Sequence, residues 1–152
     1  MPRRPRKVVV LTCNGVGMLV STAARLAGLR SQQLRPDQII VWGSATLGVN
    51  YPKAVKDANA YPLILIDGCR PRCASGIYDD KVTEGVVNPQ GFKGKVLARI
   101  YIPEVCAKHH LSLHGEKRRA YSKKGMKVVE AVAREVVDVV DRYMRGEVNP
   151  DG

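Results

Sequence analysis

The sequence predicts an α/β fold of three layers, in which an open, mostly parallel four-stranded sheet carries helices on its faces. Short apolar runs recur along the chain, each ends in glycine or polar residues, and the segments between them have helix-forming composition. Strands that alternate with helices are typical of parallel pairing through right-handed crossovers. We expect one domain over residues 1–152, with a basic arm at 1–6 and a flexible end at 146–152.

The first half of the chain contains two strand and helix patterns. An apolar run at 8–11 leads through a glycine-containing turn into a predicted helix at 16–29. A second run at 38–43 is short and β-branched. It should be followed by a polar loop and then by a short helix from about Pro52, because proline suits the first turn of a helix.

The second half continues the same alternation. Residues 62–67 predict a third strand, and we expect Pro71 to open the following helix. The run at 95–102 alternates apolar and more polar side chains, which is typical of an edge strand. The last element should be an amphipathic helix that covers the sheet. Its apolar face comprises Val129, Val132, Ala133, Val136, Val140, Tyr143 and Met144.

This layout is flavodoxin-like or Rossmann-like, and it predicts where a site should lie. In such sheets ligands bind outside the carboxyl ends of the strands. Cys13 follows the first predicted strand, Cys69 and Cys73 follow the third, and Cys106 comes four residues after the fourth. Four thiolates match a closed tetrahedral zinc site. An iron–sulfur cluster on the same four cysteines is the alternative, and His109 is the first substitute if Cys106 is not a ligand.

Two local expectations accompany the metal hypothesis. Cys73 should lie in the first turn of the helix after Pro71, where free N–H groups and the helix dipole favour the thiolate. Asp67, at the end of the third strand, should accept backbone N–H groups of the following turn rather than bind the metal.

The same cysteines also permit catalysis. A thiol enzyme or sulfur carrier would use Cys13 as the nucleophile and resolve it with Cys69 and Cys73. A phosphatase-type site is excluded, because Leu19 stands where the arginine six residues after Cys13 would be needed. Nucleotide binding at "CNGVG" is disfavoured, since the segment has neither the Gly-x-Gly-x2-Gly fingerprint nor a P-loop lysine.

Charge adds a third hypothesis, that of a basic accessory protein for nucleic acid. The formal net charge is +11, and residues 108–127 carry seven Lys or Arg against one Glu. Such a segment favours weak polyanion binding. Aromatic residues make up only 5% of the chain, which leaves little surface for base stacking. The chain has neither a signal-peptide pattern nor an apolar run long enough to span a bilayer, so we expect a cytoplasmic protein with no membrane role.

Two segments together resemble a known family. "VVLTCNGVG" is followed some fifty residues later by "ILIDGCRPRCAS", and "WGSATLG" lies between them. This pattern is similar to the DGC domain, a family of bacterial and archaeal proteins described as zinc-binding and named for the triplet seen here at residues 67–69. The similarity covers roughly residues 7–105 and implies metal binding by Cys13, Cys69 and Cys73. It supplies neither a fourth ligand nor a substrate.

Overall fold

A computed structural model describes residues 7–13, 15, 18–88 and 95–148. The predicted basic arm at 1–6 and the last part of the predicted flexible end, 149–152, lie outside these residues. None of the helices within the described ranges has the length and apolar character needed to cross a membrane.

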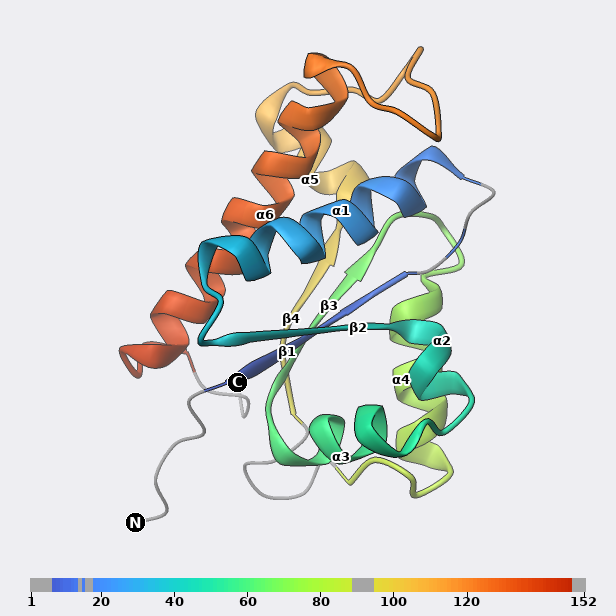
Figure 1. The fold of residues 1–152 in the computed structure, drawn as a ribbon, viewed down its shortest axis with the longest axis vertical. Coiled ribbons are helices and arrows are strands. Elements are labelled where there is room, and N and C mark those ends of the chain that lie inside the picture. Colours follow the sequence, from blue (N-terminus) through green and yellow to red (C-terminus); the bar gives the residue numbers. More distant parts are fainter. Residues whose placement is uncertain (1–6, 14, 16–17, 89–94, 149–152) are drawn as a thin grey trace.

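The strands form one parallel sheet in the order β2-β1-β3-β4 (Figure 1). The strands are β1 (Val8–Thr12), β2 (Ile39–Gly43), β3 (Leu63–Asp67) and β4 (Val96–Tyr101). This order matches the first four strands of the flavodoxin-like arrangement, with β1 and β3 as neighbours. The predicted α/β fold is confirmed, as is the position of β4 at an edge of the sheet.

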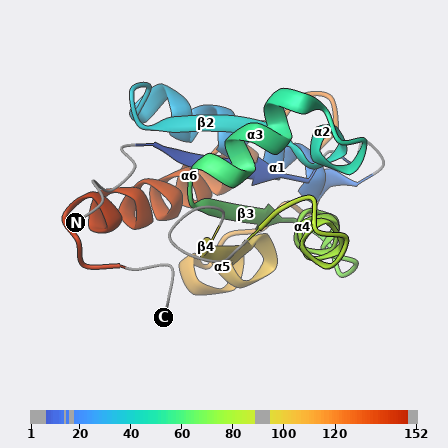
Figure 2. The ribbon, with the colours of Figure 1, turned by 90° about the horizontal axis from the view of Figure 1, so that it is seen from below.

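Helices cover both faces of the sheet and make three layers (Figures 1 and 2). One face carries α1 (Leu19–Leu34) and α6 (Lys123–Met144), with α5 (Ile102–His109) packed beside them. The other face carries α2 (Ser44–Gly48), α3 (Pro52–Ala60) and α4 (Cys73–Thr83). The predicted C-terminal amphipathic helix is therefore present as α6.

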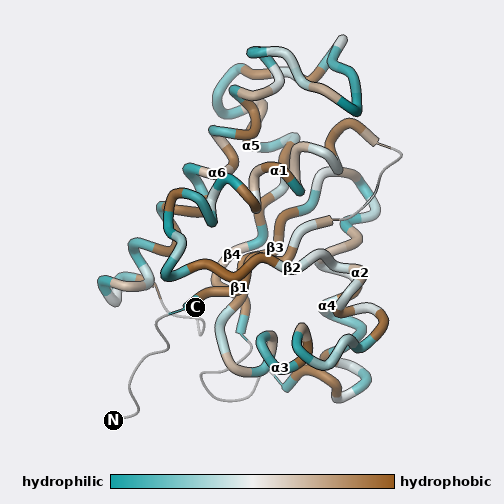
Figure 3. Tube along the Cα trace, in the orientation of Figure 1, coloured by the Kyte–Doolittle hydropathy of each residue, from teal (hydrophilic) through white to brown (hydrophobic). Residues whose placement is uncertain are grey.

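Coverage of both faces by helices explains why the central strands are apolar along their length. Along β1, Val8 and Val10 pack in the core beneath α1 and α6, whereas Val9 and Leu11 pack in the core on the opposite face. Because successive side chains point to opposite faces, a strand covered on both sides is apolar throughout. Figure 3 shows this hydrophobic character along the central strands.

Helix α1 is longer than predicted and is tied to α6 by charges. It begins at Leu19 and runs to Leu34, so it continues past the apolar stretch into polar residues. Nε of Arg30 lies 2.8 Å from a carboxylate oxygen of Glu130, and Nη2 of Arg35 lies 2.9 Å from one of Asp141. These ion pairs support the polar end of the helix, which composition alone does not predict.

Two other predictions are corrected. Residues 44–48 were expected to be loop but form the short helix α2, whose Leu47 is buried in the core with β1 and β3. The helix after β3 begins at Cys73 and not at Pro71. Arg72 has a left-handed backbone with φ of 50°, which cannot lie inside a right-handed helix, so it marks the start of α4.

Candidate thiol site

The site lies where β1 and β3 end side by side. The backbone N–H of Cys13 donates to the carbonyl of Ile66 at 3.1 Å, which holds the residue after β1 against the end of β3. From there the chain turns to α1 on one face of the sheet and to α4 on the other. Divergence of this kind is the switch point at which open α/β sheets bind ligands.

Cys13 is enclosed by the start of α1. Its side chain is buried, and its Sγ lies 3.7 Å from Oγ of Ser21. A Cβ added to Gly15 would stand 2.8 Å from that hydroxyl oxygen and 3.8 Å from the sulfur. Glycine at position 15 therefore leaves room for the Ser21 hydroxyl beside the thiol.

Gly68 brings the second loop onto the same helix. A Cβ at this position would lie 2.5 Å from the carbonyl oxygen of Val20, a backbone atom in the first turn of α1. Only glycine permits so close an approach of two backbones. The glycine of the Asp67-Gly68-Cys69 triplet thus has a direct packing reason.

Asp67 fixes the loop between β3 and α4. One carboxylate oxygen accepts the backbone N–H of Ala74 at 2.8 Å. The other accepts the backbone N–H of Ser75 at 3.2 Å and its hydroxyl at 2.6 Å. The carboxylate is buried and satisfies donors of the first turn of α4 that lack partners within the helix. The hydrogen bonds predicted for Asp67 are therefore present.

Cys69 and Cys73 flank the loop that Asp67 holds. Cys69 is half-buried and its carbonyl accepts the N–H of Arg72 at 3.0 Å, whereas Cys73 is exposed and begins α4. Cys73 lies close enough to Cys13 and Cys69 for both thiols to raise its pKa. Three of the four predicted cysteines, from two loops, thus lie near one another at the same end of the sheet.

Cys73 lies in the first turn of α4 as predicted, but the thiolate expected there is not favoured. The pKa of this thiol is raised, chiefly by desolvation and then by the neighbouring Cys13, Cys69 and Asp67. The N–H groups that would favour a thiolate are taken by the Asp67 carboxylate, whose charge opposes a second anion nearby.

Arg72 connects the loop between β3 and α4 to neighbouring elements. Its guanidinium carbon lies 4.2 Å from the centre of the Tyr101 ring, and Nη2 lies 4.0 Å from Oε1 of Glu104. These contacts join the loop before α4 to the end of β4 and the start of α5. Sequence spacing does not predict them, because the partners are some thirty residues apart.

Cys106 lies in a different environment. It is within α5 and packs against the core formed with α1 and α6. Burial raises the pKa of its thiol, and it is not among the groups that raise the pKa of Cys73. The loop position expected for Cys106 is therefore replaced by a helical one that turns this residue toward the core.

The histidines are no better placed for a metal shared with the three thiols. His109 ends α5, and its Nε2 lies 3.6 Å from Oε1 of Glu135 on α6. His110 and His114 are exposed. Throughout the described ranges, no three side chains of His, Cys, Asp or Glu stand together in the arrangement of a metal site.

The Ser21 hydroxyl beside Cys13 is the site group that the sequence reasoning missed. A Ser-Thr pair in the first turns of the helix after a cysteine-containing loop was the available signal.

Comparisons with protein-family models, with curated proteins and with solved structures found no match. The resemblance to the DGC domain therefore remains a prediction from the motif residues alone.

Proposed function

We propose that this protein binds a thiophilic metal ion, zinc in the first instance, through Cys13, Cys69 and Cys73 at the carboxyl edge of the sheet. The observation that carries the proposal is the convergence of these three thiols from two loops at the switch point between β1 and β3.

The donor set suits zinc in chemistry and number. Three protein ligands leave a fourth position for water or another ligand, as in open zinc sites. Sulfurs on one zinc ion must lie within roughly 4 Å of each other, since each Zn–S bond is about 2.3 Å long. The three thiols lie near one another but are not in the arrangement of a metal site within the described residues, so closure on an ion requires reorientation of the side chains.

Binding would also alter the acid–base state of the site. The pKa of the Cys73 thiol is raised by desolvation and by its neighbours, so Cys73 keeps its proton more readily than an exposed free thiol does. A dication reverses that preference, because it replaces repulsion between thiolates with direct bonds. Metal uptake should therefore release protons.

The test is metal analysis of protein purified without added metal, together with titration of reactive thiols before and after denaturation. We expect about one zinc per chain. The ion should be lost from the Cys69→Ser, Cys73→Ser double variant and retained in Cys106→Ser. Loss from Cys106→Ser as well would restore Cys106 as the fourth ligand.

Two results would change the conclusion. Native protein without stoichiometric metal, in which Cys13, Cys69 and Cys73 all react freely, would refute metal binding. A brown protein with visible absorption would replace zinc with an iron–sulfur cluster.

Thiol chemistry is the second candidate, and the nearness of Cys73 to Cys13 favours it. Cys73 is exposed whereas Cys13 is buried, so the accessible sulfur is Cys73 and not the predicted Cys13. Reaction of Cys73 with a disulfide substrate would form a mixed disulfide, and attack by Cys13 would release the second thiol. A Cys13–Cys73 disulfide detected by mass spectrometry in metal-free protein would support this candidate over zinc.

A further inference from the structure

Most arginines in the described part of the chain are neutralised by carboxylates. They pair across α1 and α6, along α6 and just after it, between α4 and β4, and between the residue before α4 and α5. These arginines are Arg30, Arg35, Arg72, Arg99, Arg134, Arg142 and Arg145. Arg25 and Arg119 differ, because neither forms an ion pair with a carboxylate of the described residues. Both are exposed.

These two arginines lie at one hollow. It has a volume of about 450 Å³ and is lined by Thr22 and Arg25 of α1 and by Arg118 and Arg119 of the loop between α5 and α6. Arg118 and Arg119 are the central residues of a turn, which is closed by the N–H of Ala120 donating to the carbonyl of Lys117 at 3.2 Å.

Hydrogen bonds hold the turn at Arg118 and Arg119 against α1. The buried Thr22 hydroxyl donates to the carbonyl of Arg118 at 3.2 Å, and the Tyr121 hydroxyl donates to the carbonyl of Leu19. Contacts on both sides of the turn therefore hold its backbone in place. A ligand would not have to order this segment, which lowers the entropic cost of binding.

The acidic residue of this loop is already engaged. Glu116 accepts the backbone N–H groups of Ser122 at 2.9 Å and Gly125 at 2.8 Å, at the start of α6. Hydrogen bonds from Ser122 are the largest cause that lowers the pKa of Glu116. Its carboxylate serves the helix start and, among the residues that the structure describes, forms no ion pair with Arg25 or Arg119, so these two arginines keep their positive charge for another partner.

We propose that the hollow lined by Thr22, Arg25, Arg118 and Arg119 binds a phosphate-type oxyanion. Planar guanidinium groups match such anions through paired, charge-assisted hydrogen bonds. The lining contains no aromatic residue on which a base would stack, so the phosphate group itself is the recognised element.

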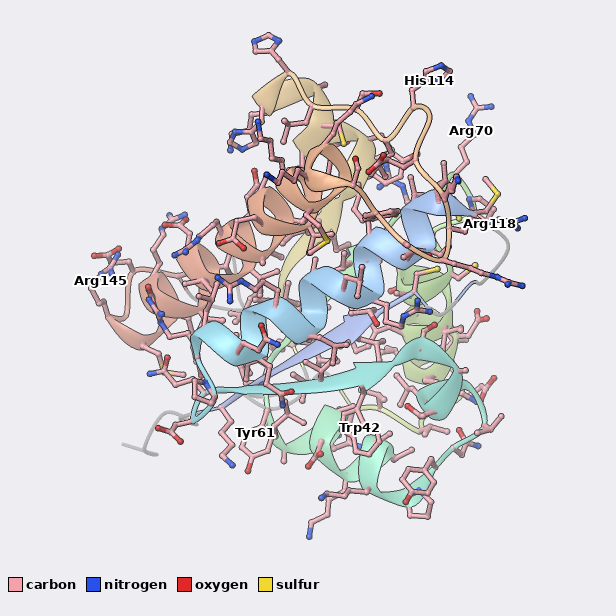
Figure 4. All side chains as sticks on the ribbon, turned by 45° about the horizontal axis from the view of Figure 1, so that its top comes forward. Trp42, Tyr61, Arg70, His114, Arg118 and Arg145 are labelled. Carbon is pink, nitrogen blue, oxygen red and sulfur yellow. The ribbon has the colours of Figure 1, made fainter. Side chains whose placement is uncertain are left out.

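The hollow lies at the same end of the molecule as the thiol site. Ser21, next to Thr22 in α1, contacts the Cys13 sulfur. Figure 4 shows Arg118 and Arg70 projecting from the same end, far from Arg145. An anion in the hollow would therefore lie beside the first turns of α1, in which Ser21 contacts the thiol site. This anion site is separate from the metal ligands and does not depend on the metal proposal.

The test compares two charge-matched double variants of the full chain. Arg25→Gln with Arg119→Gln removes two positive charges at the hollow, whereas Lys53→Gln with Lys56→Gln removes two exposed charges from α3 on the other face of the sheet. Inorganic phosphate is titrated by calorimetry, and a short fluorescent single-stranded DNA is titrated by anisotropy at two salt concentrations.

We expect the arginine variant to bind inorganic phosphate at least about tenfold more weakly, the loss typical of one charge-assisted hydrogen bond. The lysine variant should change by less than about twofold, since distant surface charges are screened. If DNA binds no more tightly than phosphate, the natural ligand is a small phosphorylated compound. If DNA binds far more tightly, with a steep dependence on salt, the hollow holds a nucleic-acid phosphate.

Two outcomes would overturn the proposal. One is unchanged phosphate affinity in the arginine variant. The other is an equal loss in both variants, which would show that net charge alone attracts the anion.

Discussion

Replacement of Asp67 by Asn tests whether this carboxylate organises the thiol site. The change keeps the size of the side chain and removes its charge. One of the two oxygens becomes an NH2 group, which cannot accept the N–H of Ser75 that now lies 3.2 Å from the carboxylate. The hydroxyl of Ser75 can rotate and accept instead, but the buried N–H loses its partner.

The expected loss of stability follows from the hydrogen bonds that Asp67→Asn removes or weakens. A buried donor without a partner costs about 1–3 kcal/mol, and the bond to the N–H of Ala74 is weakened when the acceptor loses its charge. Together these losses amount to about 3 kcal/mol of unfolding free energy. For a chain of this length, about 3 °C per kcal/mol gives a fall in Tm of roughly 9 °C.

The assay is urea unfolding at neutral pH, with Asp79→Asn as the matched control. Asp79 lies in α4, the helix whose first turn Asp67 holds, but it is exposed and pairs with Arg99 at the surface, 2.7 Å away. Breaking a surface pair costs at most about 1 kcal/mol. Because Asp67 places α4 and so Cys73, Asp67→Asn should also weaken zinc retention without abolishing it.

Equal unfolding free energies for Asp67→Asn and Asp79→Asn, within about 0.5 kcal/mol, would refute the reasoning. That result would mean that the loop keeps its conformation without the carboxylate. A metal bond to the Asp67 carboxylate in a zinc-bound structure would also show that the assigned role is wrong.

Two further predictions concern packing and pH. Gly68→Ala should lower stability by about 1–3 kcal/mol, because its Cβ would meet the carbonyl of Val20 at 2.5 Å. Gly76→Ala in α4 should raise stability by about 0.5–1 kcal/mol, because nothing lies within 4 Å of the new Cβ. Shifts in Tm of the same sign for Gly68→Ala and Gly76→Ala would contradict this pair of predictions. The hydrogen bond from Arg35 lowers the pKa of Asp141 in the folded state. The stabilisation that ionised Asp141 gives the folded state is therefore complete above the unfolded pKa of about 3.9. It is lost as pH falls through the folded pKa. The stability gap between the parent and Asp141→Asn should hold from about pH 7 to 5 and close in acid, whereas a gap constant to about pH 2 would contradict the linkage.

The strands and the last helix of this protein are local consequences of its sequence. Apolar runs such as residues 63–66 can be recognised in the sequence because a strand covered on both faces carries apolar side chains on both. The period of apolar residues in α6 is readable for a similar reason, since a single buried face imposes helical spacing. The placement of Cys13 and Cys69 after neighbouring strands follows from the same pattern.

Only the tertiary structure decided which cysteines meet. Cys106 comes after β4 as predicted, but the chain there forms α5, and packing against α1 and α6 turns the residue toward the core. A helix of eight residues that begins at Ile102-Pro103 has too little periodicity to be recognised in isolation. Its direction depends on surfaces supplied by distant segments.

The arginine hollow and the raised pKa of Cys73 also depend on long-range contacts. Thr22 and Arg118 are 96 residues apart, and Asp67 reaches across a loop to the start of α4. Sequence reveals which charges and thiols the chain possesses and near which strand ends they fall. Whether a charge is paired, or a thiol is desolvated, depends on which segments fold against it, because electrostatic and solvation energies are set by distance and burial.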